Sequence, residues 1–476
     1  LGFGPNVSVV AAFFGYLFLG ILFRNFTRWE NNIVQTAGTS AAQTAFMCVI
    51  LAAFDLLAQT PGQDYTFAPS VVESFLWLTF AGILGILLAV PLRRHYVEEE
   101  ALTYADGVAA AETIIVLDAR GKEARRAALA LFVAAAVSAA VWFLTTKWGG
   151  RLLDVPLDAE GKQPGVLPEV LLATMGGLTA LFLKWRTLAR TFSTMSSKAV
   201  QSGDLPMRWI ALGVAGASVA LVILEYVFFG LPIWMTLIAI AISVPLMLVG
   251  LRVLGETNWG PISQLTNMMQ ALFAALMPGK LTANLAASGT TGTIATQSEA
   301  IMQDYKAGHI LGSTPRYLTY SQLLAAPIGA LAVALVNPQL RDLYGVGGEG
   351  LASPISIRIA GFADILSKGF DALPAYALTF LVIGAAVGIL IALGEAFVPG
   401  GKTWLPSATG LGIGMMVPGA VVFVMVLGGI LMALWRRLHT PSADQLGMPL
   451  ASGLIAGEAI MAIVIPALIA MKLIAP

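Results

Sequence analysis

Charged residues are scarce in this chain. They make up 11% of its 476 residues, whereas a soluble globular domain carries about 25%. Hydrophobic residues make up 57%, and the mean hydropathy is +0.81. The formal net charge is zero, which gives no support for nucleic-acid binding. This composition predicts an all-α, polytopic membrane protein with no soluble domain and with the lipid bilayer as its surroundings.

Cysteine and histidine are almost absent. Cys48 is the single cysteine, so a disulfide framework within the chain is excluded. The three histidines (His95, His309 and His439) lie far apart in the sequence, so no clustered metal site is visible. An intramembrane enzyme would need a nucleophile–base pair or a metal cluster, and these residues supply neither. We therefore expect no cofactor, no metal site and no enzymatic activity.

Glycine and proline are abundant instead, at 49 and 24 residues. Tightly packed or broken membrane helices use both. Segments of about 20 apolar residues predict membrane spans. They fall near 5–23, 33–58, 70–91, 127–146, 166–183, 209–229, 232–251, 317–336, 376–393, 419–435 and 450–473. Less regular segments at 104–117, 261–277, 282–303 and 404–418 extend the range to 15. The chain begins at Leu1, and we expect part of a first helix to be missing.

The distribution of basic residues predicts an orientation. Lysine and arginine concentrate in the 93–126 and 184–208 connections, which should therefore face the cytoplasm. Arg436 and Arg437 mark another cytoplasmic end. Connections 60–69 and 230–231 contain neither residue type and should lie on the opposite side. We expect the long connection 337–375 there too, with a short helix near 361–371.

The stretch from 255 to 316 is unusually polar for a chain of this hydropathy. A helix surrounded by hydrocarbon cannot carry many amides and acids, because each unpaired polar group there costs several kcal/mol. These side chains must face protein, water or a solute, which is typical of a transport path. They are Glu256, Asn258, Gln264, Asn267, Gln270, Asn284, Gln297, Glu299, Gln303 and Asp304.

Two helical faces combine these polar residues. Gln35, Thr39 and Gln43 follow an i, i+4, i+8 spacing and form one polar seam. Thr293 and Gln297 share a second face with Asp304. Two interpretations stay open for the first seam. Its side chains line a path for solute, or they supply hydrogen bonds between packed helices.

Acids in this region are candidates for proton coupling. Glu299 is the predicted proton carrier, because burial favours the neutral form of a carboxylate and lets it take up a proton near neutral pH. Asp304 is the reserve candidate, and Glu256 is a third. The alternative is that Glu299 and Asp304 are interfacial acids neutralised by Lys306 or Arg316.

A helix break is predicted at Gly260-Pro261. The preceding helix should end near Leu254, and Asn258 can cap the helix that starts around Pro261. A broken helix exposes backbone groups that can bind solute. An ordinary loop at the membrane surface is the other interpretation.

A weak internal repeat suggests two similarly oriented halves. Residues 31–44 resemble 284–297 in their mixture of Gly, Ser, Thr and Gln, and 102–112 resemble 405–414. We assign 1–254 to the first half and 255–476 to the second, with broken or re-entrant helices. Such repeats place substrate between the halves, near the midplane.

Several runs carry a family resemblance. They are ENNIVQTAGTSAA (30–42), PLRRHYVEEEALTYADGVAAAE (91–112), GETNWGPIS (255–263), MQDYKAGHILGSTPR (302–316) and GLIAGEA (453–459). Over nearly the whole chain the sequence resembles the oligopeptide transporter family, which includes the yellow-stripe-like carriers of metal chelates. The 302–316 run is the most specific part. Tyr104-Ala105-Asp106 departs from the proline-containing run usual in the family.

The resemblance implies an all-helical secondary transporter, often with about 16 spans and usually driven by protons. The expected helix count is thus about 11–16. The match resembles a prokaryotic member, which implies the plasma (inner) membrane of a prokaryote. A homo-oligomer is compatible with this reading.

We therefore expect proton-coupled import of a small peptide or a peptide-like metal chelate. The alternatives are a metal-chelate carrier that does not transport peptides and a channel-like pore. The expected substrate-binding residues are Gln35, Thr39, Gln43, Asn258, Asn284, Thr293 and Gln297.

Overall fold

The computed structural model describes residues 7–20, 23, 26–59, 65–118, several positions between 129 and 140, and residues 203–344, 354–368, 377–398 and 419–470. Every regular element in these ranges is a helix, so the predicted all-α class is confirmed. The longer helices are α1 (Val7–Gly15), α2 (Arg28–Phe46), α3 (Cys48–Gln59), α4 (Val71–Ala89), α5 (Ala105–Asp118), α9 (Met207–Phe228), α10 (Ile233–Thr257), α11 (Ile262–Leu276), α12 (Leu281–Leu311), α13 (Pro315–Tyr344), α14 (Pro354–Ser367), α15 (Ala377–Phe397) and α18 (Gly419–Ala470).

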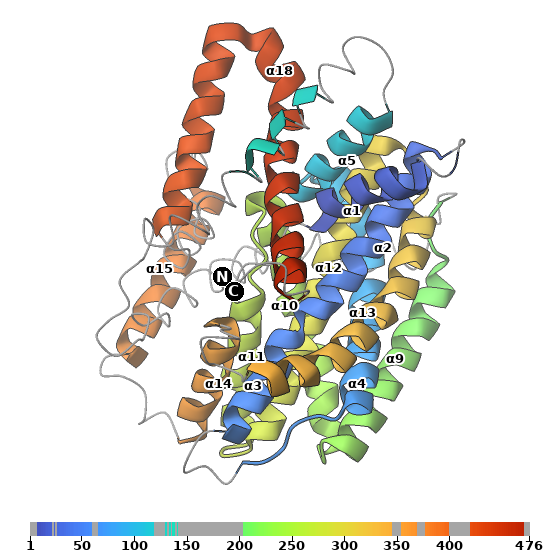
Figure 1. Cartoon of the computed structure of the whole chain (residues 1–476). Helices are drawn as coiled ribbons and strands as arrows, with labels where there is room; N and C mark the ends of the chain where they lie inside the picture. Colours follow the sequence, from blue (N-terminus) through green and yellow to red (C-terminus); the bar gives the residue numbers. More distant parts are fainter. Residues whose placement is uncertain are drawn as a thin grey trace.

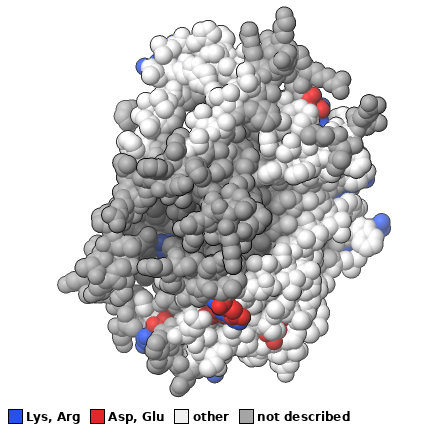
Figure 2. All heavy atoms as spheres, viewed as in Figure 1, with Lys and Arg blue, Asp and Glu red and all other residues white. Residues whose placement is uncertain are grey.

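Within the part of the chain that the structure describes, five helical segments are long and apolar enough to cross a membrane. They are Arg28–Gln59, Val71–Leu92, Met207–Phe228, Ile233–Thr257 and Pro315–Asp342, and each coincides with a predicted span. Among the described residues visible in Figure 2, charged atoms are few, and a group of them lies toward the lower end of the view. The chain is thus a polytopic membrane protein. The predicted spans near 127–146 and 166–183 lie largely or wholly outside the described residues, as does the segment 404–418.

Helix α12 lies in the middle of the bundle, in contact with α2, α4, α5, α10, α11 and α13 (Figure 1). Its 31 residues are buried almost without interruption from Ala283 to Tyr305, although they include many amides, hydroxyls and acids. At 1.5 Å per residue it is about 46 Å long. The apolar helices around it separate these polar groups from lipid, which is where polar side chains of a membrane protein can be stabilised.

Glycines allow the neighbouring helices to approach α12 and α2 closely. An ideal Cβ at Gly85 of α4 would overlap the backbone of Ile294 in α12. A Cβ at Gly329 of α13 would overlap the carbonyl group of Ala41 in α2. Small residues at membrane helix interfaces bring backbones together in this way. The abundance of glycine in the sequence therefore has a packing cause.

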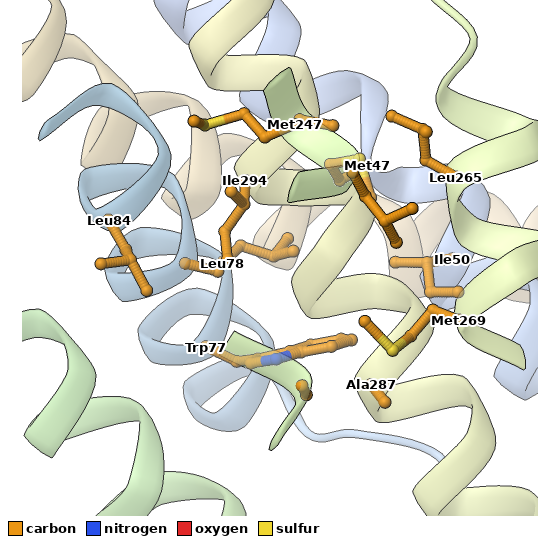
Figure 3. Close-up of a cluster of buried hydrophobic side chains, with 14 of the residues drawn as sticks. Met47, Ile50, Trp77, Leu78, Leu84, Met247, Leu265, Met269, Ala287 and Ile294 are labelled. Carbon is orange, nitrogen blue, oxygen red and sulfur yellow. The ribbon is translucent and has the colours of Figure 1, made fainter. Parts of the chain in front are cut away.

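The apolar core fills the space between α3, α4, α10, α11 and α12. Figure 3 shows Trp77 of α4 reaching toward α12 among aliphatic and methionine side chains. Its ring meets the Phe229 ring edge to face at a centroid distance of 5.1 Å, and Phe54 lies 6.1 Å away. Such aromatic pairs add to packing beyond the area that they bury. This core fixes α4, α9 and α12 relative to one another.

The predicted helix break lies between α10 and α11, but Asn258 has a different role from the predicted one. Asn258 adopts the left-handed conformation (φ 59°) and ends α10, its N–H donating to the Leu254 carbonyl at 2.8 Å. The N-cap of α11 is Pro261, which makes no side-chain capping bond. The prediction that Asn258 caps the second helix was therefore wrong. Asparagine tolerates the left-handed region, which suits a helix C-terminus.

Two other boundaries differ from the predictions. The short helix expected near 361–371 is α14, which begins earlier, at Pro354, and ends at Ser367. The two spans expected at 419–435 and 450–473 belong to α18, which continues across a kink at His439 (φ −156°, ψ 80°). Figure 1 shows this kink as an arch at the upper end of the molecule, the same end as α5.

Candidate functional site

Side chains of α2 and α12 form what we call the polar column: Gln35, Thr39, Ser40 and Thr44 from α2, with Gln297 and Asp304 from α12. All six are at most 1% exposed. Helix α2 starts at a capping box in which Thr27 and Glu30 bond each other's backbone N–H groups, which fixes where its seam begins. The helical spacing of the seam then turns these side chains toward α12.

One part of the polar column surrounds Asp304. The Gln35 amide donates to Asp304 Oδ1 at 2.6 Å and to Thr39 Oγ1 at 3.0 Å. Asn32 Nδ2 donates in turn to Gln35 Oε1 at 2.9 Å, which orients the amide. Thr39 Oγ1 lies 3.2 Å from Ser8 Oγ of α1. The neutralising partners predicted as the alternative for Asp304 are replaced here by a neutral amide.

The other part surrounds Gln297, whose amide is fully used. Its Nε2 donates to the Ser40 carbonyl at 2.9 Å and to Thr44 Oγ1 at 2.6 Å. Its Oε1 accepts from Ser40 Oγ at 3.2 Å and from Gln322 Nε2 of α13 at 2.9 Å. A fully satisfied amide between three helices stabilises their packing. For Gln297 the contacts favour the helix–helix interpretation.

Glu299 faces away from the polar column, toward the break between α10 and α11. Its carboxylate lies against Gly250 and Gly260: an ideal Cβ at Gly250 would be 3.0 Å from Oε1, and one at Gly260 would overlap the carboxylate. The side chain is 6% exposed. Two glycines thus make room for the predicted proton carrier beside the predicted break.

The remaining candidates lie elsewhere. Asn284, at the start of α12, donates to the Gln270 carbonyl at 2.6 Å. Thr293 bonds the Gly289 carbonyl of its own helix at 2.8 Å. Gln43 is only half-buried and stands outside the contacts of the polar column. Asn284 and Asp304 are 20 residues apart, which places them about 30 Å apart along α12. The predicted substrate-binding residues therefore extend along the helix.

Two further candidates lie at the end of α10. Glu256 is paired with Arg252 at 2.7 Å, one helical turn away. Asn258 Nδ2 donates to Asp106 Oδ1 at 2.7 Å, and its Oδ1 accepts from the Asp106 N–H at 3.0 Å. These contacts connect the break to the start of α5. Roles in proton coupling or substrate binding stay predictions for both residues.

Several buried oxygens of this region have no hydrogen-bond donor among the residues that the structure describes: Asp304 Oδ2, Glu299 Oε1, Asn32 Oδ1 and Gln322 Oε1. Among the described residues, no ion pair joins Asp304 or Glu299 to a basic side chain. Buried polar atoms are normally partnered, so these acceptors are open to further donors. Protons, ammonium groups and amide N–H groups have that chemistry.

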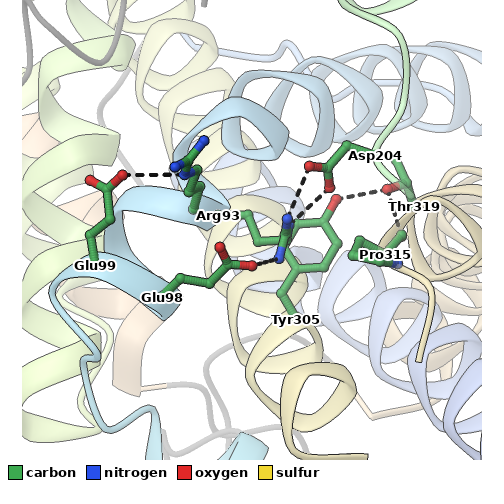
Figure 4. Close-up of polar contacts among 8 residues, drawn as sticks. Arg93, Glu98, Glu99, Asp204, Tyr305, Pro315 and Thr319 are labelled. Atoms are coloured by element: carbon green, nitrogen blue, oxygen red, sulfur yellow. Dashed lines mark hydrogen bonds and ion pairs between the residues drawn. The ribbon is translucent and has the colours of Figure 1, made fainter. Parts of the chain in front are cut away.

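Sequence reasoning missed an ion-pair cluster at the upper end of the bundle (Figure 4). Arg93 is 7% exposed and donates two bonds to Asp204, at 3.0 and 2.9 Å, and one to Glu98 at 2.5 Å. Its guanidinium lies 5.9 Å from the Tyr305 ring centre, and Tyr305 bonds Thr319 at 2.7 Å. Tyr305 lies in the MQDYKAGHILGSTPR run. That run was the sequence signal that could have pointed to this cluster.

Two cavities lie at opposite ends of α12. The lower cavity, of about 610 Å³, is lined by residues around the α9–α10 and α11–α12 turns, including Tyr65, Phe229, Lys280 and Thr282. The upper cavity, of about 250 Å³, lies beside the Arg93 cluster. Small-molecule sites commonly have volumes of about 300–1,000 Å³. Within the described ranges, no group of three or more His, Cys, Asp or Glu side chains could hold a metal ion.

Sequence comparisons relate this chain to known proteins. The family model of the oligopeptide transporter proteins matches residues 1–150 and 169–469. The chain is 25% identical over 245 residues to the Saccharomyces cerevisiae protein named "Putative oligopeptide transporter YGL114W", covering 49% of this chain and 33% of the relative. It is 27% identical over 213 residues to "Probable metal-nicotianamine transporter YSL14" of Oryza sativa, covering 43% and 29%.

A third relative is "Metal-nicotianamine transporter YSL2" of Arabidopsis thaliana, 26% identical over 196 residues, covering 40% of this chain and 29% of the relative. In each case the match spans about a third or less of the relative's length. The family model, by contrast, covers most of this chain. On the evidence of that match and of the helical membrane fold, the chain belongs to the oligopeptide transporter family.

Proposed function

We propose that this chain works as a secondary active transporter that couples the uptake of a small oligopeptide or a peptide-like metal chelate to protons. The observation that carries the proposal is the pair of buried acids on α12. Asp304 and Glu299 each keep an oxygen without a donor, and neither has a basic partner among the described residues. A buried carboxylate of this kind is stabilised by binding a proton.

The proposal places solute between two halves, 1–254 and 255–476. Helix α2 belongs to the first half and α12 to the second, and the polar column joins them through Gln35 with Asp304 and through Gln297 with Ser40. A change in the protonation of Asp304 alters the bond that crosses this boundary. That is the physical basis for coupling proton binding to movement of one half against the other.

Both substrate classes fit the acceptor oxygens, because peptides and amino-acid-like chelators present amine and amide N–H groups. A chelate carrier that does not transport peptides is the alternative, supported by the relatives that are named metal-nicotianamine transporters. The prokaryotic origin and the inner-membrane location stay predictions, and the relatives named above come from yeast and plants.

The test is uptake into proteoliposomes under an imposed pH gradient, with di- to pentapeptides competing against ferric and nickel chelates. We expect saturable accumulation that collapses when a protonophore removes the gradient. Flux that does not saturate and ignores the gradient would identify a channel-like pore. Competition by chelates alone would select the chelate carrier.

Two variants test the acids. Glu299→Gln and Asp304→Asn keep the side-chain shape and remove the titrating group. We expect one or both to exchange substrate without accumulating it. Asp342→Asn is the matched control, because the Asp342 side chain is 69% exposed at the end of α13. Full accumulation by both acid variants would remove these residues from the coupling mechanism.

A further inference from the structure

Glu225 is a buried acid on α9, a helix with one exposed face and one buried face. On α9 the side chains of Ile223, Tyr226 and Val227 are 55–63% exposed, whereas Glu225 is 1% exposed. Helix α9 carries no other acid. The carboxyl group therefore stands on the inner face of an apolar helix, where a polar group persists only with specific partners.

Three other helices supply those partners. Thr236 of α10 donates its hydroxyl to Glu225 Oε2 at 2.6 Å, and Thr290 of α12 donates to Oε1 at 2.6 Å. The Trp77 indole N–H of α4 donates to Thr290 Oγ1 at 2.8 Å. The hydrogen bonds form one chain from Trp77 through Thr290 to Glu225, and the carboxyl group is the point where α4, α9, α10 and α12 meet.

The groups that face Glu225 from the packed elements are neutral. They are Thr236 from α10, Thr290 from α12 and Trp77 from α4, and no basic side chain of the described ranges is among them. An ionised carboxylate without a cation is costly in such surroundings. A hydroxyl can donate to a carboxylate or accept from a carboxylic acid. The hydroxyl groups at this site can therefore hydrogen-bond both protonation states of the carboxyl group.

The lower cavity lies close to Glu225 along the chain. Phe229 lines that cavity one helical turn from Glu225, and the backbone N–H groups of Phe229 and Leu231 both donate to the Glu225 carbonyl, at 3.1 and 3.0 Å. The turn continues through Gly230, whose φ of +66° favours glycine. The turn that follows Glu225 thus supplies part of the lining of the lower cavity.

From this geometry we propose that Glu225 is a second proton-binding site, separate from Asp304 and Glu299 and one helical turn from the lining of the lower cavity. Thr290, which bonds Glu225, and Glu299 are nine residues apart on α12, or about 13 Å along the helix. The role of Glu225 in uptake rests on the proposed proton-coupled transport. The binding of a proton at Glu225 is testable without transport.

The first measurement is infrared difference spectroscopy of the full chain in lipid, between acidic and alkaline pH. We expect a carbonyl band of a protonated carboxylic acid that Glu225→Gln removes. Thr236→Val keeps the acid but takes away one donor, so it should retain the band and shift its frequency. Glu99→Gln is the matched control, because the Glu99 side chain is 54% exposed, and it should leave the band unchanged. An unchanged band in Glu225→Gln overturns the proposal.

The second measurement is accumulation in proteoliposomes. We expect Glu225→Gln to exchange substrate as the wild type does, and its pH-gradient-driven accumulation to fall to the level reached without a gradient. Wild-type accumulation that ignores the pH gradient would refute proton coupling as the function, and the infrared band would still decide whether Glu225 binds a proton. If the wild type is proton-driven and Glu225→Gln accumulates equally well, the inference about Glu225 fails alone.

Discussion

Helices α12 and α9 differ in both the polarity and the burial of their side chains. Helix α12 is rich in hydroxyls, amides and acids and is enclosed by protein, whereas α9 is apolar and exposes Leu212, Val219 and Ile223. In water a polar helix would lie outside and an apolar one inside. In lipid the arrangement is reversed, because backbone and side-chain polar groups must be satisfied within the protein. In this chain, a helix rich in polar side chains therefore lies at the centre of the molecule.

The largest effect should come from disturbing the close approach to α12. Gly85→Leu would drive a side chain into the backbone of Ile294, so we expect little folded protein in detergent by size-exclusion chromatography. Gly216→Leu on α9 is the matched control, since a Cβ there meets nothing within 4 Å. Equal yields of the two variants would contradict the packing described for α12.

The next largest effect should come from replacing a buried polar side chain by an apolar one, or an exposed apolar side chain by a polar one. Gln297→Leu removes the hydrogen bonds that the amide makes with the Ser40 carbonyl, Thr44 and Gln322, and each such bond contributes about 0.5–1.5 kcal/mol. Leu324→Gln on α13 puts an amide at a position that is 73% exposed. We expect both changes to lower the thermal unfolding midpoint in nanodiscs. Stabilisation by Gln297→Leu, as hydropathy alone would predict, would show that the polar column is not needed for packing.

A smaller effect should distinguish two adjacent arginines at the upper end by their contributions to stability. Arg93→Lys loses the two-bond contact with Asp204, and a hydrogen bond to a charged group is worth about 1.5–3 kcal/mol. Arg94→Lys alters a pair whose side chains are 50% and 54% exposed, and exposed pairs contribute about 0–1 kcal/mol. We expect the unfolding midpoint to drop for Arg93→Lys only. The same drop in both variants would mean that burial of Arg93 does not matter.

The smallest effect concerns pH. The hydrogen bond to Glu100, with the charges of Glu100 and Glu99, raises the pKa of His95 above 6.5, although burial opposes this. Because the folded pKa is the higher one, the stabilisation is fully present below about pH 6.5 and is lost as pH rises through the raised value. We expect His95→Gln to flatten the dependence of unfolding midpoint on pH in that range. The exposed His309→Gln is the control, and it should keep the wild-type slope.

Much of the arrangement could be predicted from the sequence. The spacing of Gln35 and Thr39 predicted one helical seam, and both side chains lie together beside Asp304. The Gly260-Pro261 break and the acid Glu299 were each singled out from the sequence, and the fold places them in contact. Periodicity and chain breaks are local properties, so sequence reveals them.

The hydrogen-bond partners of these side chains could not be predicted in the same way. Asn258 was expected to cap α11, but it ends α10 and bonds Asp106, which is 152 residues away. Gln297 and Gln43 look alike in the sequence, yet Gln297 is fully bonded and Gln43 is half-buried. Arg93 was counted only as a basic residue for orientation. Each of these outcomes depends on which helix comes alongside, and that is a tertiary property.

The sequence by itself determined that this protein is helical, that it belongs in a membrane and that polar groups concentrate in the 255–316 stretch, because hydropathy, periodicity and helix breaks depend on neighbouring residues. Only the tertiary structure decided which of those groups are satisfied and which keep an oxygen without a donor. It also separated Glu225 from the outward-facing residues of α9. The physical reason is that a buried hydrogen bond depends on angle and distance between helices, which no single segment specifies.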